Sequence, residues 1–542
     1  MSPRYARSFG TFDHAFAMTG AKAFMPPQGI LVIAAWFAAR GWRVRVVDEN
    51  VRPVSATDLE WADVMMVSGM HVQHDAVVDV VDRARRRGVI TALGGPSVSA
   101  SPEWYPEPDL LHLGELGDAT VRLAERLERD VSPPAGQESY RTAERLPLEE
   151  FPVPAYGLID LDDYFLASVQ ASSGCPFQCE FCDIPALYGR KPRLKSPDQV
   201  LRELDAIVAA GRPDAVYFVD DNFIADPHAA RRLLEALVAW QEKHGHPLDF
   251  ACEATLNISG RRDLLSLMRR ARFTTMFVGI ETPDEAALKA MNKRHNLRSP
   301  ILEAVSAINA HGIEVVSGVI LGLDTDSRAT YDNVCRFIDA SAIPLLTVNL
   351  LHALPRTPLW HRLEAEDRLL HDPGDRQSNV DFLLSEDLVS EGWRQVVRHA
   401  YEPRRLYERF AHQVRDTYPH RLPVADSRYR RSPRAIRRGL RIAGRVLWQC
   451  GVRADYRREF WRLASVALRR GDVEALISAA LVGHHLITFA REALAGRAER
   501  AFYAPPRGQG GDAVARSGGD RRNGTAGTQA AIPRPKDLSP SE

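Results

Sequence analysis

Residues 165–351 alternate between short apolar segments and stretches of helical periodicity, and this alternation constrains the fold more than any other feature of the sequence. Each apolar segment has the length of one β-strand, and the stretches between them are long enough for helices. The predicted strands lie at 165–171, 215–220, 248–254, 274–280, 313–321 and 344–351. Repeated β/α units form parallel sheets, so we predict a partial (β/α)6 barrel whose chemistry lies at the carboxyl ends of its strands.

A separate α/β unit is predicted in residues 1–140. Its expected strands lie at 42–49, 64–69, 89–95 and 110–115, and its expected helices lie at 27–40, 75–88 and 119–129. This order predicts a doubly wound parallel sheet, in which the loops after the strands line the ligand crevice. Three of those loops contain glycine, at Ser68–Gly69, Gly94–Gly95 and Gly114–Gly117, where Glu115 also lies.

The rest of the chain divides by composition, because 542 residues are too many for one core. A linker rich in proline and glutamate is expected at 141–163, before the barrel domain at 164–371. Residues 372–505 have helical patterns with many arginines and tryptophans, and residues 506–542 cannot bury a core and are expected to be disordered. The basic stretch from Arg428 to Arg445 is either a solvated helix face or a contact surface for anionic lipid or an acidic partner.

The overall composition excludes some classes of function. The 70 basic and 70 acidic residues balance, whereas a general nucleic-acid-binding protein carries a basic excess. The nearest candidate for a membrane span, 475–490, is too short, and Asp13 and His14 interrupt any secretory signal near the start. Six cysteines make no disulfide framework, so we expect a cytoplasmic, reducing environment. Three of them are scattered and are expected to be buried: Cys252, Cys335 and Cys450.

The other three cysteines, Cys175, Cys179 and Cys182, have the spacing C-x3-C-x2-C directly after the first predicted barrel strand. Three thiolates on one loop can converge on one metal centre. Structural zinc requires four ligands, but no fourth cysteine lies nearby and the next histidine is His228. A [4Fe–4S] cubane held by three cysteines leaves one iron open for an exogenous ligand, and we favour this assignment over zinc.

The cysteine spacing, with the aromatic Phe181 before the last cysteine, resembles the signature of the radical S-adenosylmethionine (SAM) enzymes. In those enzymes SAM binds the open iron, and an electron from the cluster cleaves it to a 5′-deoxyadenosyl radical. The resemblance implies SAM contacts at the ends of the second to fifth barrel strands. They are Asp220, Asp221 and Asn222 near the amino group, Glu253, Gly279 and Glu281 at the ribose and methionine, and Gly318 and Gly322 on the strand beside adenine.

Four runs resemble one subgroup more narrowly, the cobalamin-dependent radical SAM enzymes with a helical C-terminal domain, to which the hopanoid C-2 methylases belong. The runs lie at 182–193, 219–223, 279–283 and 354–360. The resemblance covers roughly residues 5–500 and implies that the first α/β unit binds cobalamin through its glycine-bearing loops. The implied cofactors are therefore a [4Fe–4S] cluster, SAM and cobalamin.

Three departures from the subgroup's pattern bear on the cofactors and the substrate pocket. The opening β-strand that normally precedes a segment like 3–16 is missing, so either translation starts upstream or this sheet lacks its first strand. No D-x-H-x-x-G motif supplies a histidine to cobalt, which leaves His71 and His74 as ligand candidates. Arg356 replaces the usual glycine of a P-G-T-P turn, which is either a benign loop change or a change in the pocket.

The resemblance implies methyl transfer to an unactivated carbon. One SAM would methylate cobalamin, and a second would yield the radical that removes hydrogen from a substrate, which then takes the methyl group from methylcobalamin. We expect a lipid, polycyclic or other natural-product substrate, an electron donor such as a flavodoxin or ferredoxin, and no nucleic acid; peripheral membrane contact is a hypothesis. The alternatives are a cobalamin-binding radical SAM enzyme that cyclises or rearranges its substrate, and a non-catalytic iron–sulfur or zinc protein.

Overall fold

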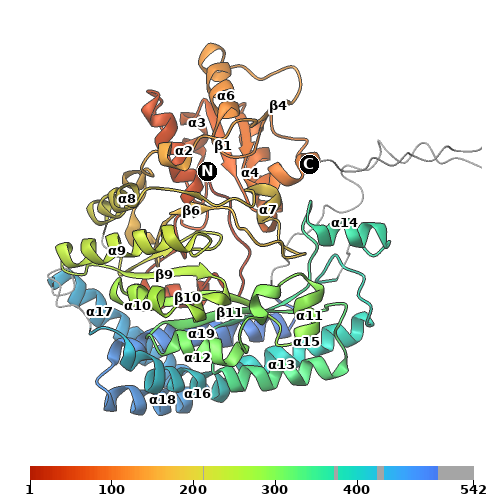
Figure 1. The fold of residues 1–542 in the computed structure, drawn as a ribbon. Helices are drawn as coiled ribbons and strands as arrows, with labels where there is room; N and C mark the ends of the chain where they lie inside the picture. Colours follow the sequence, from red (N-terminus) through yellow and green to blue (C-terminus); the bar gives the residue numbers. More distant parts are fainter. Residues whose placement is uncertain (212, 372–375, 424–431, 499–542) are drawn as a thin grey trace, which may run out of the picture.

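The computed structural model describes residues 1–211, 213–371, 376–423 and 432–498, and the predicted disordered tail lies outside these ranges. Figure 1 shows a small α/β unit at one end, a larger sheet with its helices in the middle, and the C-terminal helices at the other end. The two main sheets correspond to the two predicted α/β units, and both are parallel.

The first sheet has four strands that follow one another in chain order. They are β1 (Val64–Ser68), β2 (Ile90–Gly94), β3 (Leu110–Leu113) and β4 (Glu138–Arg141). Its helices are α2 (Gln28–Ala39), α3 (Ala56–Trp61), α4 (His74–Arg85), α5 (Pro96–Ala100) and α6 (Asp118–Arg129). In α4, Val77, Val80, Val81 and Ala84 are buried at helical spacing and pack on β1 and β2, which confirms the predicted amphipathic helix.

The strand predicted at 42–49 is wrong, because this segment forms only one isolated bridge, between Asp48 and Ser2. Ser2 N donates to Val47 O and Ser2 O accepts from Glu49 N, both at 2.9 Å, while Ser68 N donates to Met1 O at 3.2 Å. The first two residues therefore lie between 47–49 and β1, where the opening strand of the sheet was expected. In the described part of the chain no backbone pairs with 43–46, so these residues have no ladder to join.

The second sheet contains the six predicted barrel strands, all parallel and in chain order. From edge to edge they are β5 (Ala167–Val169), β8 (Ala215–Phe218), β9 (Asp249–Ala254), β10 (Phe273–Glu281), β11 (Glu314–Leu321) and β12 (Leu346–Leu350). The helices between them include α8 (Pro197–Ala210), α9 (Pro227–His244), α10 (Arg262–Arg270), α11 (Glu285–Ala290), α12 (Ile301–Asn309) and α13 (Arg328–Ser341). Since every unit advances one strand along the sheet, all carboxyl ends lie at one edge, which confirms the predicted partial barrel.

The main core lies between this sheet and its helices. Val216, Phe218 and Phe250 are fully buried there, and the ring centroids of Phe218 and Phe250 are 5.4 Å apart. The three scattered cysteines are buried, as predicted. A small antiparallel hairpin follows β5 and contains one short helix in its loop: β6 (Ser172–Ser173), α7 (Ile184–Leu187) and β7 (Arg193–Leu194).

The C-terminal part of the chain is helical, as predicted. Its helices are α14 (Pro358–Ala365), α15 (Glu386–Tyr401), α16 (Pro403–His412), α17 (Pro433–Val446), α18 (Arg457–Arg469) and α19 (Val473–Leu494). Short π-helical turns follow α16 at Gln413–Thr417 and α17 at Leu447–Arg453. Helix α1 (Asp13–Thr19) packs on α19, so the start of the chain is built into this layer.

Helix α19 is longer than the apolar stretch recognised at 475–490. Its 22 residues are sufficient in length and apolar composition to cross a membrane, and 61% of its most apolar part is buried inside the protein. Core helices of globular proteins meet the same criteria. Because α19 contacts α1, α15, α16, α17 and α18, it forms the centre of the C-terminal layer.

Candidate active site

The three predicted cluster cysteines lie on the loop between β6 and β7, at the carboxyl end of β5. Cys175, Cys179 and Cys182 are partly buried, and none of them forms a disulfide. Burial raises the pKa of each thiol, and the pKa of Cys182 reaches about 12. Metal binding must therefore displace three protons, as thiolate ligation always requires.

Two aspartates at the end of β8 hold the base of the cysteine loop. Asp221 Oδ2 accepts a hydrogen bond from the Gly174 amide at 2.7 Å, and Asp220 Oδ2 accepts one from the Ala171 amide at 3.3 Å. Burial raises the pKa of both carboxyl groups to about 6. These two residues, predicted from sequence as SAM contacts, thus fix the backbone immediately before Cys175.

The segment after α11, residues 291–296, lies against the other side of the loop. Its contacts are a hydrogen bond from Glu180 N to Met291 O at 3.0 Å, one from Asn292 Nδ2 to Gln178 O at 2.8 Å, and stacking of His295 on Phe177 with ring centroids 3.9 Å apart. Burial lowers the pKa of His295 to about 4, so this ring is neutral near pH 7. The cysteine loop is therefore held from two sides.

A buried ion pair lies beside the cysteines. Lys293 Nζ is 2.5 Å from Glu281 Oε1 at the end of β10, and it lies 5.5 Å from the ring centroid of Phe181. Burial lowers the pKa of Lys293, but Glu281 and Cys179 raise it by more, so the ammonium stays charged. A Cβ at Gly279 would lie 2.5 Å from Glu281 Oε1 and 2.8 Å from Lys293 Nζ, so this glycine leaves room for the pair, and Gly318 lies next to it on β11.

The remaining predicted SAM residues occupy different positions. Glu253, on β9, is half-buried, and burial raises its pKa to about 7. Asn222 is buried, and its Nδ2 lies 3.4 Å from Thr255 Oγ1. Gly322 instead faces Phe382, whose ring would lie 2.5 Å from a Cβ placed there. The structure thus groups Gly279, Glu281 and Gly318 with the cysteine loop, while Gly322 accommodates the C-terminal region.

The glycine-bearing loops of the first sheet meet at the carboxyl ends of its strands. Ser68 pairs with Gly94 at the ends of β1 and β2. Gly95 has a φ of 101°, and a Cβ there would lie 2.5 Å from Ser68 Oγ and 3.2 Å from Gly69 N, so only glycine fits. The third loop joins them, since Gly114 N donates to Ser99 Oγ at 2.8 Å on α5. Gly117 lies against the backbone of Glu144.

Glu115, in the third of these loops, connects the two sheets. Arg193 Nη2 of β7 lies 2.7 and 2.6 Å from the two oxygens of Glu115, and Arg145 Nη1 lies 3.2 Å from Glu115 Oε2. Arg145 also donates to the carbonyls of Leu187 and Tyr188 at 2.7 and 2.8 Å. The predicted cobalamin loop is therefore attached directly to the hairpin that carries the cysteines.

The two histidines considered as cobalt ligands are directed into the first domain. His71 is 6% exposed and its Nδ1 lies 3.1 Å from Ser97 Oγ, while burial lowers its pKa to about 4. His74 is 7% exposed and lies 3.0 Å from Asp75 Oδ1 and 3.3 Å from the Trp104 carbonyl. Neither ring is presented at the surface of the glycine-bearing loops, which gives no support to a histidine ligand from this segment.

Arg356 has a φ of 66° and is exposed, in the turn that leads into α14. The turn is closed by Thr357 Oγ1, which donates to Leu354 O at 2.7 Å and accepts from Trp360 N at 3.1 Å as the helix cap. The positive φ fits the glycine that the family resemblance implies at this point. Arg356 lines neither of the two cavities described below, which favours a benign loop change.

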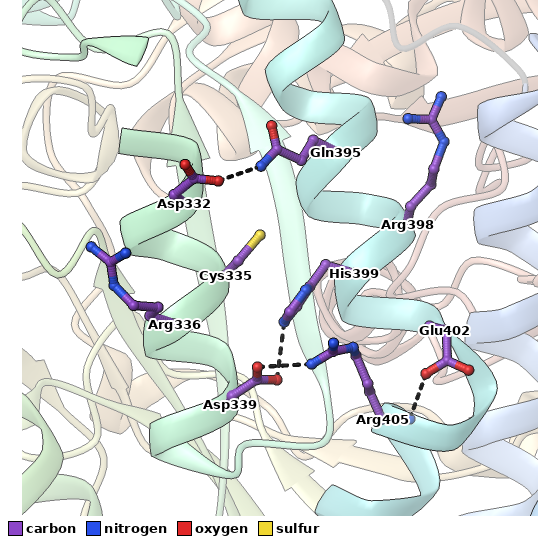
Figure 2. A pocket seen from close by; sticks show the side chains of 9 residues that line it. All are labelled: Asp332, Cys335, Arg336, Asp339, Gln395, Arg398, His399, Glu402 and Arg405. Atoms are coloured by element: carbon purple, nitrogen blue, oxygen red, sulfur yellow. Dashed lines mark hydrogen bonds and ion pairs between the residues drawn. The ribbon is translucent and has the colours of Figure 1, made fainter. Parts of the chain in front are cut away.

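Two cavities flank the barrel. One, of about 230 Å³, lies next to the cysteine loop between Phe181, Met291 and Leu359, with Arg362 paired to Glu180 at its edge. The other, of about 520 Å³, is a polar groove between α13 and α15 on the outside of the barrel (Figure 2). The charges in that groove compensate one another, since Asp339 pairs with His399 at 3.0 Å and with Arg405 at 2.9 Å. We assign it no ligand.

The donor set around the cysteines fits an iron–sulfur cubane. A lone zinc would draw four ligands to within about 2.3 Å of one centre. Three unpaired thiols on a wide loop instead match a cluster with one open iron. Lys293 and Glu281, of opposite charge, would complement the carboxylate and amine of SAM, and the glycine-bearing loops of the first sheet would hold cobalamin.

Comparison with known proteins identifies each part of the chain. Residues 16–124 match the B12 binding domain, residues 169–338 the radical SAM superfamily, and residues 357–499 a domain of unknown function. The hopanoid C-2 methylase of Rhodopseudomonas palustris is 52% identical over 503 residues, which cover 93% of this chain and 95% of that protein. An uncharacterised methyltransferase of Synechocystis is 36% identical and covers 86% of both chains.

A solved structure has the same overall arrangement. The cobalamin-dependent SAM radical enzyme OxsB, solved with aqua-cobalamin and SAM bound, matches 87% of this chain and 78% of its own with a TM-score of 0.53 and 15% identity. The chain belongs to the cobalamin-dependent radical SAM methyltransferases. Its cofactors are a [4Fe–4S] cluster, SAM and cobalamin, and it is an enzyme rather than a non-catalytic iron–sulfur or zinc protein.

Sequence reasoning missed two residues of this site. Lys293 stands in the polar run MNKRHN, where nothing in the local pattern distinguishes it from a solvated lysine. Arg193 ended a matched run but had no assigned role, because its partner Glu115 lies in another domain. A search for charged residues flanking the cysteine loop would have found Arg193, whereas Lys293 required the fold.

Proposed function

We propose that this enzyme methylates carbon 2 of a hopanoid ring system. The substrate assignment rests on the similarity to the hopanoid C-2 methylase, which extends through the helical C-terminal region as well as both cofactor domains. The reaction rests on one observation of geometry, the ion pair between Glu115 and Arg193. It holds the cobalamin loops against the cysteine hairpin, so that a substrate between the domains can meet both cofactors.

Different residues of the site would bind the cluster and SAM. Cys175, Cys179 and Cys182 would hold the cluster, and Lys293 with Glu281 would bind the amino-acid end of SAM. With its cofactors bound, the site supplies a 5′-deoxyadenosyl radical and a cobalt-bound methyl group. The first is needed because a saturated ring carbon has no acidic hydrogen that a base could remove.

The other SAM contacts are proposals on the same basis. Glu253 would accept hydrogen bonds from the ribose, and Gly279 leaves space beside Glu281, with Gly318 next to it on β11. Ser68, Gly69, Gly94, Gly95, Gly114 and Gly117 would line the cobalamin crevice. A reducing cytoplasm and an electron donor such as a flavodoxin or ferredoxin suit a cluster held by three free thiols.

The test is product analysis with a pure hopanoid and SAM that carries a deuterated methyl group. The anaerobic holoenzyme with a chemical reductant should yield a hopanoid heavier by one labelled methyl, together with S-adenosylhomocysteine and 5′-deoxyadenosine in equal amounts. A product that is rearranged but unlabelled would contradict methyl transfer. A labelled methyl group on another carbon would support methyl transfer but contradict carbon 2 as the methylated position.

A further inference from the structure

Exposed apolar side chains are concentrated on one surface of the C-terminal layer, which we call the α17 surface. Its members are exposed by 44% to 70%: Ile436, Leu440, Leu447, Trp448, Val452 and Trp461. Monomeric proteins rarely leave a contiguous group of large apolar side chains in water, and such groups mark contact sites. Figure 1 shows α17 and α18 at the end of the molecule away from the first sheet, so this surface is separate from the cobalamin loops.

Helix geometry makes these residues one face. Ile436 and Leu440 are four residues apart on one side of α17, and Leu447, the first residue of the π-helical turn that follows, lies seven residues further on. The opposite stripe, Val446 and Cys450, is fully buried against the core and fixes the orientation of the helix. The exposed side chains of this segment are therefore apolar, even though Val446 and Cys450 already pack the segment against the core.

The π-helical turn extends this face toward α18. Trp448 and Val452 are four residues apart in the turn, and the Trp461 indole donates to the Gly451 carbonyl at 2.9 Å. This bond brings the second tryptophan next to Val452. Tryptophan combines an apolar body with a polar edge and is favoured at the boundary between water and lipid.

Arginines border the apolar face, and one of them, Arg438, pairs with Asp214 at 3.4 Å. From Ser432 to Arg453 the sequence contains six arginines and no aspartate or glutamate. Arg437 and Arg441 are exposed, and within the described residues no carboxylate pairs with either. The nearest acids along the chain are compensated elsewhere: Asp455 pairs with Arg491 at 2.8 Å, and Glu459 pairs with Arg462 at 2.7 Å.

We infer that the α17 surface docks the enzyme on an anionic lipid bilayer. Apolar side chains and tryptophans would enter the interface while the flanking arginines contact lipid phosphates, as in amphipathic helices that lie in the plane of a membrane. An acidic protein would complement the arginines but leave six exposed apolar side chains without a reason. The inference rests in part on the proposed function, because a hopanoid is a membrane lipid.

Flotation of the anaerobic holoenzyme with vesicles tests the inference. Vesicles of phosphatidylcholine with phosphatidylglycerol should carry the protein upward, vesicles of phosphatidylcholine alone should carry far less, and added salt should reduce binding. The double variants Leu440→Ser/Trp448→Ala and Arg437→Gln/Arg441→Gln should each lower partitioning by about tenfold or more. Leu383→Ser, which removes another exposed apolar side chain, is the matched control and should bind like the wild type.

Two readouts separate this inference from the proposed function. The surface variants should methylate a detergent-dispersed hopanoid at the wild-type rate but lose activity on hopanoid held in vesicles. Flotation without any hopanoid methylation would contradict the proposed substrate and would still support membrane docking by the α17 surface. Absence of flotation, flotation that is unchanged in both double variants, or retention on an acidic polypeptide in place of vesicles would overturn the membrane assignment.

Discussion

Glu115 and Arg193 are 78 positions apart in the chain, yet their side chains meet at 2.6 Å. One belongs to a glycine-bearing loop of the cobalamin-binding unit, and the other belongs to the hairpin that carries the cluster cysteines. Arg145 adds a second positive charge to Glu115 and binds the carbonyls that end α7. This contact joins the loop predicted to bind cobalamin to the hairpin that carries the three predicted cluster cysteines.

Removing this contact should reduce methyl transfer to the substrate more than it reduces the cleavage of SAM to 5′-deoxyadenosine. In Arg193→Ala, methyl transfer to substrate should fall by about tenfold or more, because the ion pair with Glu115 that connects the two domains is lost. Formation of 5′-deoxyadenosine should fall much less, because the cysteines and Lys293 are untouched. Arg190→Ala, an exposed arginine of the same loop, is the control. Equal losses of both products would mean that Arg193 serves the hairpin alone.

Lys293 should be required for SAM affinity. Lys293→Met keeps the length of the side chain but removes the charge, so it should weaken SAM binding by about tenfold or more, as loss of a charged hydrogen bond does. Lys293→Arg should retain part of the SAM affinity that Lys293→Met loses. Equilibrium binding of SAM to the reconstituted protein measures this effect, with Lys289→Met on the exposed face of α11 for comparison. Normal SAM affinity in Lys293→Met would remove this residue from the site.

SAM affinity should depend on pH through Glu253. Its pKa of about 7, raised mainly by burial and further by Asp221, means that the carboxyl group is protonated below pH 7 and ionised above it. A carboxylate accepts hydrogen bonds from the ribose more strongly than a neutral carboxyl group does, so SAM affinity should rise, by up to about tenfold, between about pH 6 and pH 8. Glu253→Gln should flatten this profile. A profile that stays unchanged in the variant would assign the titration to Asp220 or Asp221.

Arg356 should be a local source of strain. The left-handed conformation costs a non-glycine residue roughly 1–2 kcal/mol, whereas glycine loses roughly 0.5–1 kcal/mol more backbone entropy on folding. Arg356→Gly should therefore stabilise the protein by about 0.5 kcal/mol, and Arg356→Val should destabilise it. Denaturant unfolding of the holoenzyme measures both changes. A changed KM for the hopanoid in Arg356→Gly would instead make this turn part of the substrate pocket.

The parts of the fold that could be predicted are those specified by local pattern. The barrel strands are buried on both faces, so runs such as Phe273–Glu281 stand out between amphipathic helices. The segment 42–49 largely alternates apolar and charged residues as a strand does, but it finds no partner for most of its length, which no single-segment pattern can reveal. The π-helical turn after α17 inserts into a regular helix and has no signal of its own.

The residues of the site also differ in whether the sequence alone could reveal them. The cysteine spacing is a property of one short loop, so the cluster ligands could be predicted from the sequence alone. Lys293 and Arg193 acquire their roles from partners 12 and 78 positions away, Glu281 and Glu115, so only the folded chain reveals them. The sequence showed that Arg356 stands where the family pattern has glycine, but its positive φ required the backbone.

Iron and cobalt content is the measurement that tests the account most directly. The protein should be purified without oxygen from cells supplied with cobalamin, and both metals should be counted per chain. The account predicts about four irons and one cobalt, with the cobalt retained in Cys179→Ala and the iron lost. Iron without cobalt, in protein whose first domain is folded, would contradict a site built from both cofactors.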